Sequence, residues 1–373
     1  MSMFGKTAAT LSLILAAAWA DGAFADDAPA AAAAPAAPAK PTGPTLSDVL
    51  GASGLTVTGY VDATGSIAHD SSADYSTFAL NQASFTLAMQ PATGFGALVQ
   101  VAAGTEANGN YAPGYGYGAT SSSTKFDIVQ GFAQYVAGKS TVIMGKYVTL
   151  AGAEVAAPTG NTNITRSLLF WYSEPVTHTG ARVTYAASDT ASFMVGLNDG
   201  WNAETSVGNG KTVELGASLT PSKTFAFTAA AYYGDQNGTT ANGLHRLGKK
   251  ALLDAVATWT VSSAVTVIVN ADWDQQNITG GSTASWYGAA AYLNYAINDK
   301  WRTSVRVEYL DDKEGFANTA LVGPELKVDE GTVTFGYAPS KNYEFRLEGR
   351  YDKNDAFSSG NITQAWLAAL YKF

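Results

Sequence analysis

The stretch that decides the fold is Tyr343-Glu344-Phe345-Arg346-Leu347-Glu348-Gly349-Arg350-Tyr351-Asp352, near the end of a chain of 373 residues. Aromatic or small apolar residues alternate strictly with charged residues. A helix would scatter these charges around its whole circumference, whereas an extended strand puts all of them on one face. The stretch therefore predicts a β-strand with one apolar face and one water-facing face.

The same period of two recurs from Leu55 to Phe373, with turn residues between the repeats. Trp301, Val305 and Tyr309, for example, alternate with Arg302, Arg306 and Glu308. We expect about sixteen strands, most of them near the length of about 9 to 11 residues that a tilted membrane strand needs. The expected strands are 55–68, 78–90, 94–104, 125–137, 140–148, 178–187, 190–199, 211–220, 224–234, 249–261, 264–276, 285–296, 300–311, 328–338, 342–352 and 363–373.

The connections between these strands alternate in length. Tight turns such as Gly138-Lys139 and Ser262-Ser263 alternate with long polar loops such as 105–124 and 149–177. Short periplasmic turns and longer extracellular loops are typical of outer-membrane barrels, and a soluble β-sandwich has no reason to sort its loops this way. We therefore expect an all-β fold, a transmembrane antiparallel up-and-down β-barrel.

Aromatic residues gather near both ends of the expected strands. Rings prefer the headgroup interface of a bilayer, so two such bands indicate two membrane boundaries. Strands favour aromatic residues in any case, but the outward positions in mid-strand are mostly Ala, Val, Leu and Gly. The interface candidates are Trp259, Trp273, Tyr295, Trp301, Tyr309, Tyr337, Tyr343 and Phe373.

The N-terminal segment resembles an export signal. Lys6 supplies a positive charge, residues 8–18 are apolar, and Ala23-Phe24-Ala25 fits a cleavage site, so residues 1–25 are expected to be a Sec signal peptide that is removed. A membrane anchor would need a longer apolar stretch. Residues 26–54 are expected to be an Ala/Pro-rich periplasmic linker with a short helix from Thr45 that stops at Gly51, and residues 55–373 the barrel.

Composition excludes several classes of protein. The chain has no cysteine, which excludes a disulfide-stapled scaffold, and its net charge of −9 argues against nucleic acid as a partner. The three histidines, His69, His178 and His245, have no second ligand at a spacing that metal sites use. We find no catalytic set of residues, so neither an enzyme nor a cofactor or metal site is expected.

Charged residues on the water-facing side of the strands are candidates for the lining of a pore. They can bias the passage of ions if the lumen holds water, or they can pair into a ladder of salt bridges if it does not. Sixteen strands leave room for an aqueous channel, which favours solvated charges. These pore-lining candidates are Arg182, Arg302, Arg306, Glu308, Glu344, Arg346, Glu348 and Arg350.

The longest expected loop, 149–177, carries its own apolar segment at Leu168–Tyr172. A loop of this length with apolar residues is not expected to extend freely into water. One hypothesis is that it folds into the barrel as a constriction, with Glu154 and Arg166 as opposed charges at the opening. The alternative, that it packs over the rim or extends the strands, stays open.

Several stretches resemble the OmpL-like beta-barrel porin-2 family. The resemblance lies in Thr58-Gly59-Tyr60-Val61-Asp62-Ala63, Gly145-Lys146-Tyr147-Val148-Thr149 with Gly152-Ala153-Glu154, Asn163-Ile164-Thr165-Arg166-Ser167, Thr177-His178-Thr179-Gly180-Ala181-Arg182, Asn198-Asp199-Gly200-Trp201 and Arg346–Asp352. It spans nearly all of the expected mature chain. It implies an outer-membrane porin of a Gram-negative bacterium, without catalytic residues and with no defined solute.

The expected function is passive diffusion of small hydrophilic solutes or ions through a water-filled barrel. The alternative is a structural or adhesive barrel whose lumen is occluded. The expected partners are outer-membrane lipids, small solutes and the barrel-assembly machinery, which would read the final strand ending in Phe373. Association into homotrimers, as in many sixteen-stranded porins, stays open.

Overall fold

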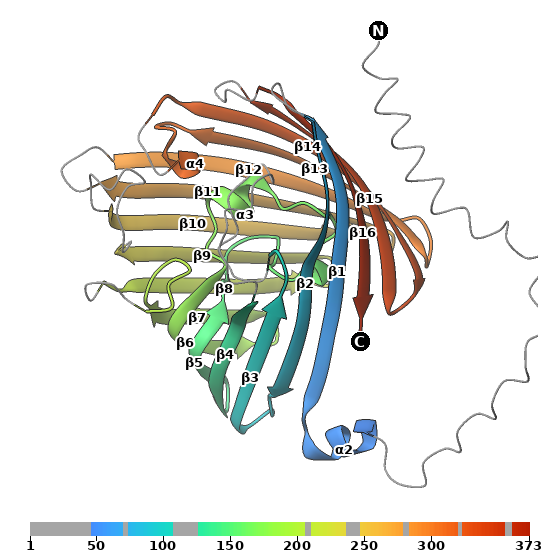
Figure 1. Ribbon diagram of the computed structural model, residues 1–373. Helices are drawn as coiled ribbons and strands as arrows, with labels where there is room; N and C mark the ends of the chain where they lie inside the picture. The colour runs from blue at the N-terminus through green and yellow to red at the C-terminus, as the bar shows by residue number, and fades with distance from the viewer. Residues whose placement is uncertain are drawn as a thin grey trace, which may run out of the picture. The chain divides into compact units, whose positions relative to one another are not determined.

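Sixteen antiparallel strands close into one barrel in the computed structural model, which describes residues 46–69, 74–106, 126–205, 210–235, 247–278, 283–319, 323–354 and 360–373 (Figure 1). Each strand pairs with its neighbours in sequence, and β1 pairs with β16. The all-β, up-and-down fold expected from the alternating pattern is confirmed.

The bounds of the strands agree with the expected ones to within a few residues. The strands are β1 (Thr56–His69), β2 (Asp74–Met89), β3 (Gly94–Ala103), β4 (Phe126–Ala137), β5 (Ser140–Val148), β6 (Thr177–Ser188), β7 (Ala191–Asn198), β8 (Thr212–Ser222), β9 (Phe225–Asp235), β10 (Leu247–Thr260), β11 (Val265–Ile278), β12 (Thr283–Ala296), β13 (Trp301–Asp312), β14 (Leu326–Ser340), β15 (Tyr343–Asn354) and β16 (Ile362–Lys372).

The seam between β1 and β16 closes the barrel. Ala63 lies opposite Ala369 in this pair, and the backbones of Gly59 and Phe373 exchange two hydrogen bonds of 3.1 and 3.0 Å. The Phe373 ring lies so close to Gly59 that a Cβ there would collide with it. A closed sheet leaves no row of unpaired peptide groups, which hydrocarbon would not tolerate.

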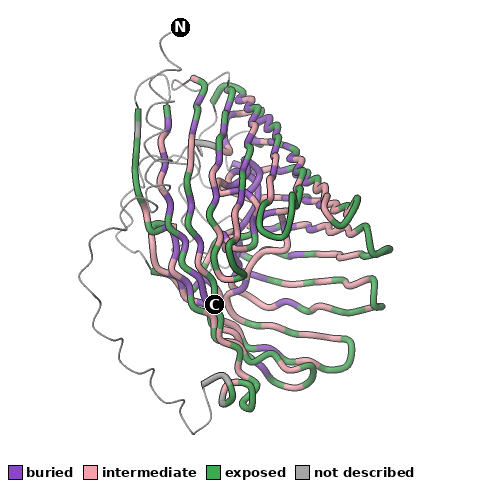
Figure 2. Tube along the Cα trace, turned by 90° about the vertical axis from the view of Figure 1, so that its right-hand side faces the viewer, coloured by how far each residue is buried: buried purple, intermediate pink, exposed green. Residues whose placement is uncertain are grey.

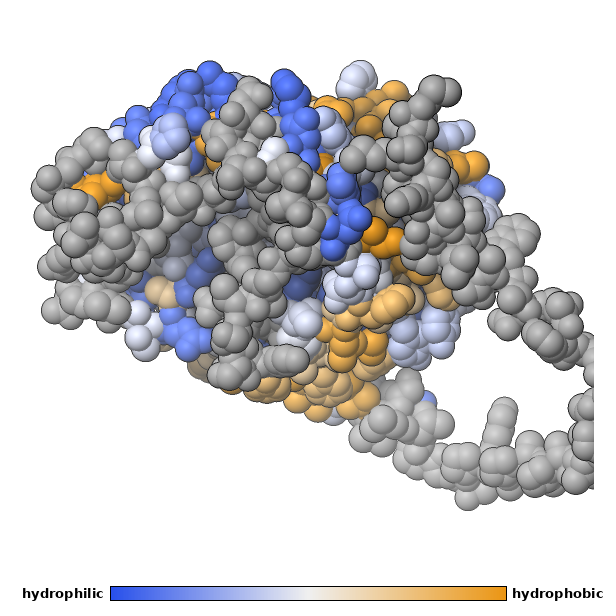
Figure 3. Space-filling model, turned by 45° about the horizontal axis from the view of Figure 1, so that its top comes forward, coloured by the Kyte–Doolittle hydropathy of each residue, from blue (hydrophilic) through white to orange (hydrophobic). Residues whose placement is uncertain are grey.

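Side chains alternate between the two faces of the barrel wall. On β13 and β15 the charged residues Arg306 and Glu348 are buried inside, whereas Val307 and Phe345 are exposed outside. Figure 2 shows this alternation as a change of colour along the strands, and Figure 3 shows hydrophobic residues gathered on the outer side of the wall. Since no second sheet in the described part of the chain covers the apolar face, the arrangement is that of a barrel in lipid rather than of a soluble sandwich.

Besides the strands, the described residues form three α-helices and a short 3₁₀ helix. These are α2 (Leu46–Ser53), α3 (Leu168–Tyr172), α4 (Phe316–Thr319) and η2 (Pro158–Gly160). The expectation that the first helix stops at Gly51 is wrong. The helix continues to Ser53, and Gly54 then takes a positive φ of 71°, the left-handed conformation that commonly ends a helix. The expected signal peptide, 1–25, and linker residues 26–45 lie outside the described residues.

None of the helices in the described part of the chain is long and apolar enough to cross a membrane. The largest buried apolar cluster of the described residues lies inside the barrel, where α3 packs against β11 to β14. The interior of the barrel is therefore partly filled, and the segment that fills it is the β5–β6 loop.

Candidate constriction inside the barrel

The β5–β6 loop, residues 149–176, lies inside the barrel, where Figure 1 shows α3 enclosed by the strands. The backbone N–H of Ala153 donates to Asn270 Oδ1 on β11 at 2.7 Å, and that of Ile164 donates to Glu348 Oε2 on β15 at 2.5 Å. Both partners lie on the inner face of the wall. The structure thus places this loop across the lumen rather than over the rim.

The apolar segment of the loop forms α3. The Ser167 hydroxyl accepts a hydrogen bond of 3.0 Å from the Phe170 N–H and so caps the first turn. Leu168 and Leu169 are fully buried against the inner wall, in a cluster that includes Trp286, Tyr292 and Leu310. Burial of these side chains holds one limb of the loop against β12 and β13.

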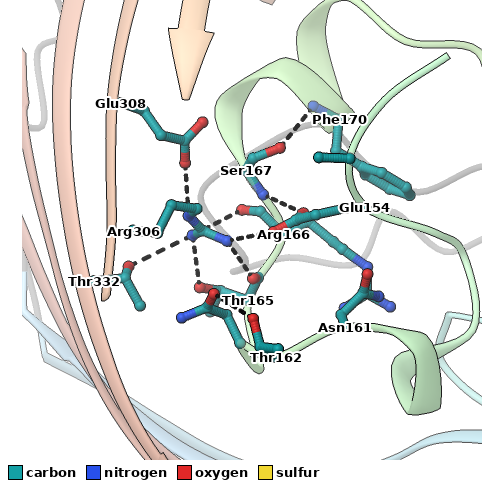
Figure 4. A network of polar contacts seen from close by, with 12 residues as sticks. Glu154, Asn161, Thr162, Thr165, Arg166, Ser167, Phe170, Arg306, Glu308 and Thr332 are labelled. Carbon is teal, nitrogen blue, oxygen red and sulfur yellow. Dashed lines mark hydrogen bonds and ion pairs between the residues drawn. The ribbon is translucent and has the colours of Figure 1, made fainter. Parts of the chain in front are cut away.

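Arg306 on β13 is the centre of the polar contacts between wall and loop (Figure 4). Its guanidinium is fully buried and lies 2.8 Å from Glu154 of the loop, 2.8 Å from Glu308 and 3.2 Å from Glu330. It also donates to the Thr165 carbonyl at 2.7 Å. A buried guanidinium needs partners for all its N–H groups, and here the loop supplies several of them.

Four arginines of the wall bind the loop in the same way, through its backbone carbonyls. Besides Arg306, Arg302 donates to Thr162 at 2.8 Å, Arg346 to Pro158 at 3.2 Å and Arg350 to Arg166 at 2.7 Å. Arg302 and Arg306 lie on β13, and Arg346 and Arg350 lie on β15. All four are on the inner face of the wall. They form a row of donors along one side of the lumen, which we call the arginine clamp.

Two carboxylates of the wall bind the loop from the other direction, by accepting from its N–H groups. Glu348 accepts from Thr165 N at 2.9 Å as well as from Ile164 N, and Glu308 accepts from Leu168 N at 2.7 Å. Charge-assisted hydrogen bonds of this kind are stronger than neutral ones. The backbone of the loop is therefore fixed by wall residues of both signs.

The expectation that the inward charges are solvated is wrong for most of them. Arg182, Arg306, Glu308, Arg346, Glu348 and Arg350 are buried, while Arg302 and Glu344 keep some exposure and pair with each other at 2.5 Å. Arg182 pairs with Glu214 at 2.7 Å and lies 4.3 Å from the Tyr147 ring centroid. The physical reason is that the loop fills this side of the lumen and replaces water around these groups.

The expected opposition of Glu154 and Arg166 is also wrong. Glu154 accepts from Arg306 and, at 2.7 Å, from Ser167 N, so its charge is used within the loop and the clamp. Arg166 instead donates to the Ala156 carbonyl at 2.9 Å and lies 5.6 Å from the Phe170 ring centroid. Its Nε is buried with no hydrogen-bond partner in the described part of the chain.

Arg166 borders the space that the loop leaves beside β2, β15 and β16. This cavity has a volume of about 80 Å³, and its lining includes Asn81, Glu106, Arg166, Arg350 and Trp366. Burial raises the pKa of Glu106, and the positive charge of Arg166 partly opposes that rise. A second cavity, of about 540 Å³, lies at the tight-turn end of β8 to β10 and is lined mostly by Thr and Ser, with Lys223 and Phe225 among its other residues.

Sequence reasoning missed a second cluster of charged groups inside the barrel. Glu174 of the loop lies close to Asp254 on β10 and Asp272 on β11, and Lys250 lies between the Trp201 and Trp286 rings. Burial, with the charge of Asp254 as the next cause, raises the pKa of Glu174 well above its usual range. The register of β10 against β11 pairs Asp254 with Asp272, and the fold of the loop brings Glu174 to them.

The eight aromatic residues expected at the membrane interfaces all lie on the outer face of the wall, exposed or half-exposed. Neighbouring strands bring several of them into contact near the tight turns. Trp301 and Tyr337 have ring centroids 4.5 Å apart, and those of Tyr343 and Tyr371 are 4.8 Å apart. Such a band fits the depth at which rings with a polar tip prefer to lie.

Solved structures with the same fold include several outer-membrane proteins. The anion-selective porin from Comamonas acidovorans has a TM-score of 0.63 and 10% identity over 86% of this chain and 99% of its own. The channel DcaP of Acinetobacter baumannii has a TM-score of 0.61 and 12% identity over 86% of this chain and 97% of its own. The trimer form of OmpT from Vibrio cholerae has a TM-score of 0.61 and 10% identity over 86% of this chain and 99% of its own.

At these identities the similarity concerns the fold. No curated protein matches the chain. The family model described as "Putative beta-barrel porin-2, OmpL-like" matches residues 54–371, which is the whole barrel. The chain therefore belongs to the OmpL-like beta-barrel porin-2 family and is a β-barrel porin.

Proposed function

We propose that small hydrophilic solutes diffuse passively through this porin, along a path that the β5–β6 loop narrows. The observation that carries the proposal is the arginine clamp, which fixes the loop to the inner face of β13 and β15. With that side of the lumen filled, solutes pass on the side of β1 to β5. No covalent step and no cofactor enter such a process.

The wall on the side of β2 to β4 supports a path for neutral and polar solutes. Its inward residues include several glutamines, which bond to one another: Gln130 to Gln100 at 2.9 Å and Gln90 to Gln134 at 3.0 Å. Amide side chains donate and accept without carrying charge. Arg166, at the edge of the loop, adds a positive charge whose Nε has no hydrogen-bond partner in the described part of the chain.

The exposed aromatic residues support an assignment of the two membrane boundaries. Trp259, Tyr295, Trp301, Tyr337, Tyr343 and Phe373 mark the periplasmic boundary, and Trp273 and Tyr309 the outer one. Lipid headgroups are the partners of these rings. Phe373, with its ring over Gly59 at the seam, is the residue that the barrel-assembly machinery would read on the last strand.

A homotrimer is the assembly that we propose for these barrels in the membrane. The support comes from the fold, since a solved structure of OmpT with the same fold is a trimer form. Gel mobility of the unheated protein, compared with that of chemically cross-linked protein, tests this assignment.

Conductance of the refolded protein in planar bilayers tests the proposed function. We expect steady openings that scale with salt concentration, and larger openings after deletion of residues 161–166, because this segment includes three of the four carbonyl acceptors of the clamp. A folded, inserted protein without conductance would instead favour the structural or adhesive barrel with a closed lumen. Swelling of liposomes in sugars and amino acids of increasing size then gives the solute limit.

A further inference from the structure

Three carboxylates meet inside the barrel without a side-chain cation between them. Glu174 comes from the end of the β5–β6 loop, Asp254 from β10 and Asp272 from β11, and one oxygen from each lies within 4.8 Å of the others. Their exposed fractions are 6%, 3% and 5%. This group, which we call the acidic triad, takes no part in the arginine clamp.

The register of the sheet makes the triad costly as it stands. Asp254 and Asp272 are direct cross-strand partners in the β10–β11 pair. Like charges placed directly opposite each other destabilise an antiparallel pair, and burial removes the water that would screen them. Asn270 donates to Asp254 at 2.7 Å and to Asp272 at 3.3 Å, but an amide carries no charge to offset the two carboxylates.

The remaining oxygens of the triad are without hydrogen-bond partners in the described part of the chain. They are both oxygens of Glu174, Oδ1 of Asp254 and Oδ2 of Asp272. A buried polar atom without a partner costs free energy, and native proteins rarely leave several together. Glu174 belongs to the loop rather than to the wall, and its unpartnered carboxylate points at the two aspartates.

The nearest lysine is used elsewhere. Lys250 Nζ lies 3.6 Å from Asp274, and it is 4.7 Å from the Trp201 ring centroid and 5.0 Å from that of Trp286. Among the described residues no ion pair joins it, or any arginine, to a member of the triad. No side-chain cation of the described residues therefore neutralises the triad.

The loop is shaped to hold Glu174 at this place. Gly152, in the opposite limb of the loop, has a φ of 93°, and a Cβ there would collide with the Glu174 carboxylate. The next residue, Ala153, is fixed by its N–H bond to Asn270, which is also the donor to both aspartates. The backbone thus makes room for a carboxylate against the aspartate pair.

We propose that the acidic triad binds one divalent cation, Ca²⁺, which ties the end of the β5–β6 loop to β10 and β11. Carboxylate oxygens are the ligands that hard divalent cations take. Ca²⁺ has bonds of about 2.3–2.6 Å and tolerates irregular geometry, so it reaches oxygens with this spacing. Mg²⁺, with bonds of about 2.0–2.1 Å, would require the three carboxylates to move closer.

The test is calorimetric titration of the refolded full-length protein, stripped with EDTA, with CaCl₂ or MgCl₂ in detergent. The variants are Glu174→Gln and Asp272→Asn, and the control is Glu325→Gln, an exposed carboxylate that pairs with Lys313 and Lys327 outside the triad. We expect one Ca²⁺ per barrel in the wild type and the control, weaker binding of Mg²⁺, and at least a tenfold loss of Ca²⁺ affinity in both variants.

Thermal unfolding provides a second measurement, which does not depend on calorimetry. Ca²⁺ should raise the unfolding temperature of the wild type and EDTA should lower it, with no such change in Glu174→Gln. The proposal is overturned if the wild type binds neither ion, or if the variants bind as tightly as the wild type. An unfolding temperature that responds to pH but not to Ca²⁺ would mean that shared protons, rather than a metal, neutralise the triad.

Discussion

Arg306 on β13 and Glu154 in the β5–β6 loop form an ion pair of 2.8 Å inside the barrel, where both side chains are almost fully buried. The pair joins two segments that are 152 residues apart in the sequence. Because Glu308 and Glu330 contact the same guanidinium, one cation serves three carboxylates. Arg306 therefore ties the loop to the wall and offsets the charge of three carboxylates at once.

Replacement of Arg306 by alanine should destabilise the barrel and loosen the loop. Removal of one partner of a buried ion pair typically costs about 3–5 kcal/mol, because the remaining charges are left uncompensated. We expect a lower temperature for the loss of heat-modifiable gel mobility, and larger, noisier single-channel currents.

The matched control for this change is Lys353→Ala. Lys353 pairs with Asp329 at 3.6 Å, with both side chains more than half exposed. An exposed pair contributes about 0–1 kcal/mol, so this variant should behave like the wild type. Equal effects of the two substitutions would contradict the central role of Arg306.

Replacement of Arg166 by alanine should change ion selectivity. Its guanidinium borders the cavity, donates to two backbone carbonyls, lies near the Phe170 ring and keeps an unpartnered Nε. Loss of this positive charge should make the channel less favourable to anions. The reversal potential in a salt gradient should then shift toward the equilibrium potential of the cation. An unchanged reversal potential would exclude Arg166 from the path of the ions.

The strands could be predicted from the sequence because the alternation at Tyr343–Asp352 and at Trp301–Tyr309 has only one structural explanation. The same alternation placed Arg302, Arg306 and Glu348 on the inner face. It could not assign their partners, since the conformation of a long loop depends on contacts such as that of Arg346 with the Pro158 carbonyl. Those contacts, in turn, decide whether an inward charge meets water or protein.

The acidic triad is a different case, because part of it could have been found. Asp254 and Asp272 lie at equal distances along the chain on either side of Ser263, and the turn at Ser262-Ser263 was predicted. A hairpin centred on Ser263 makes the two aspartates direct partners, as the structure has them, whereas a two-residue turn at Ser262-Ser263 would have set Asp254 opposite Ala271. The approach of Glu174 to this pair had no signal in the sequence.

The buried pair of Arg182 and Glu214 should show strong coupling in a double-mutant cycle. Arg182 donates to both oxygens of Glu214, at 2.7 and 3.2 Å, and Glu214 is fully buried. We expect the double variant, Arg182→Gln with Glu214→Gln, to destabilise the barrel by less than the sum of the two single variants. A coupling free energy of about 1–3 kcal/mol is reasonable for groups in one network, and a value near zero would contradict the pairing.

Replacement of Gly152 by alanine should displace the loop, whereas the same change at Gly349 should not. Gly152 has a φ of 93°, which an alanine adopts only at a cost of about 1–2 kcal/mol, and the added methyl group would meet the Glu174 carboxylate. Gly349 lies on the outer face of β15 with no atom within 4 Å of a Cβ placed there, so alanine fits and can add slightly to stability. We therefore expect a lower unfolding temperature and faster proteolysis within 149–176 for Gly152→Ala, and values at or above those of the wild type for Gly349→Ala. If the loop were protected from protease in both variants, the contact between Gly152 and Glu174 would not be what holds this limb in place. The hydrogen bond from Ala153 to Asn270 would then have to be sufficient by itself.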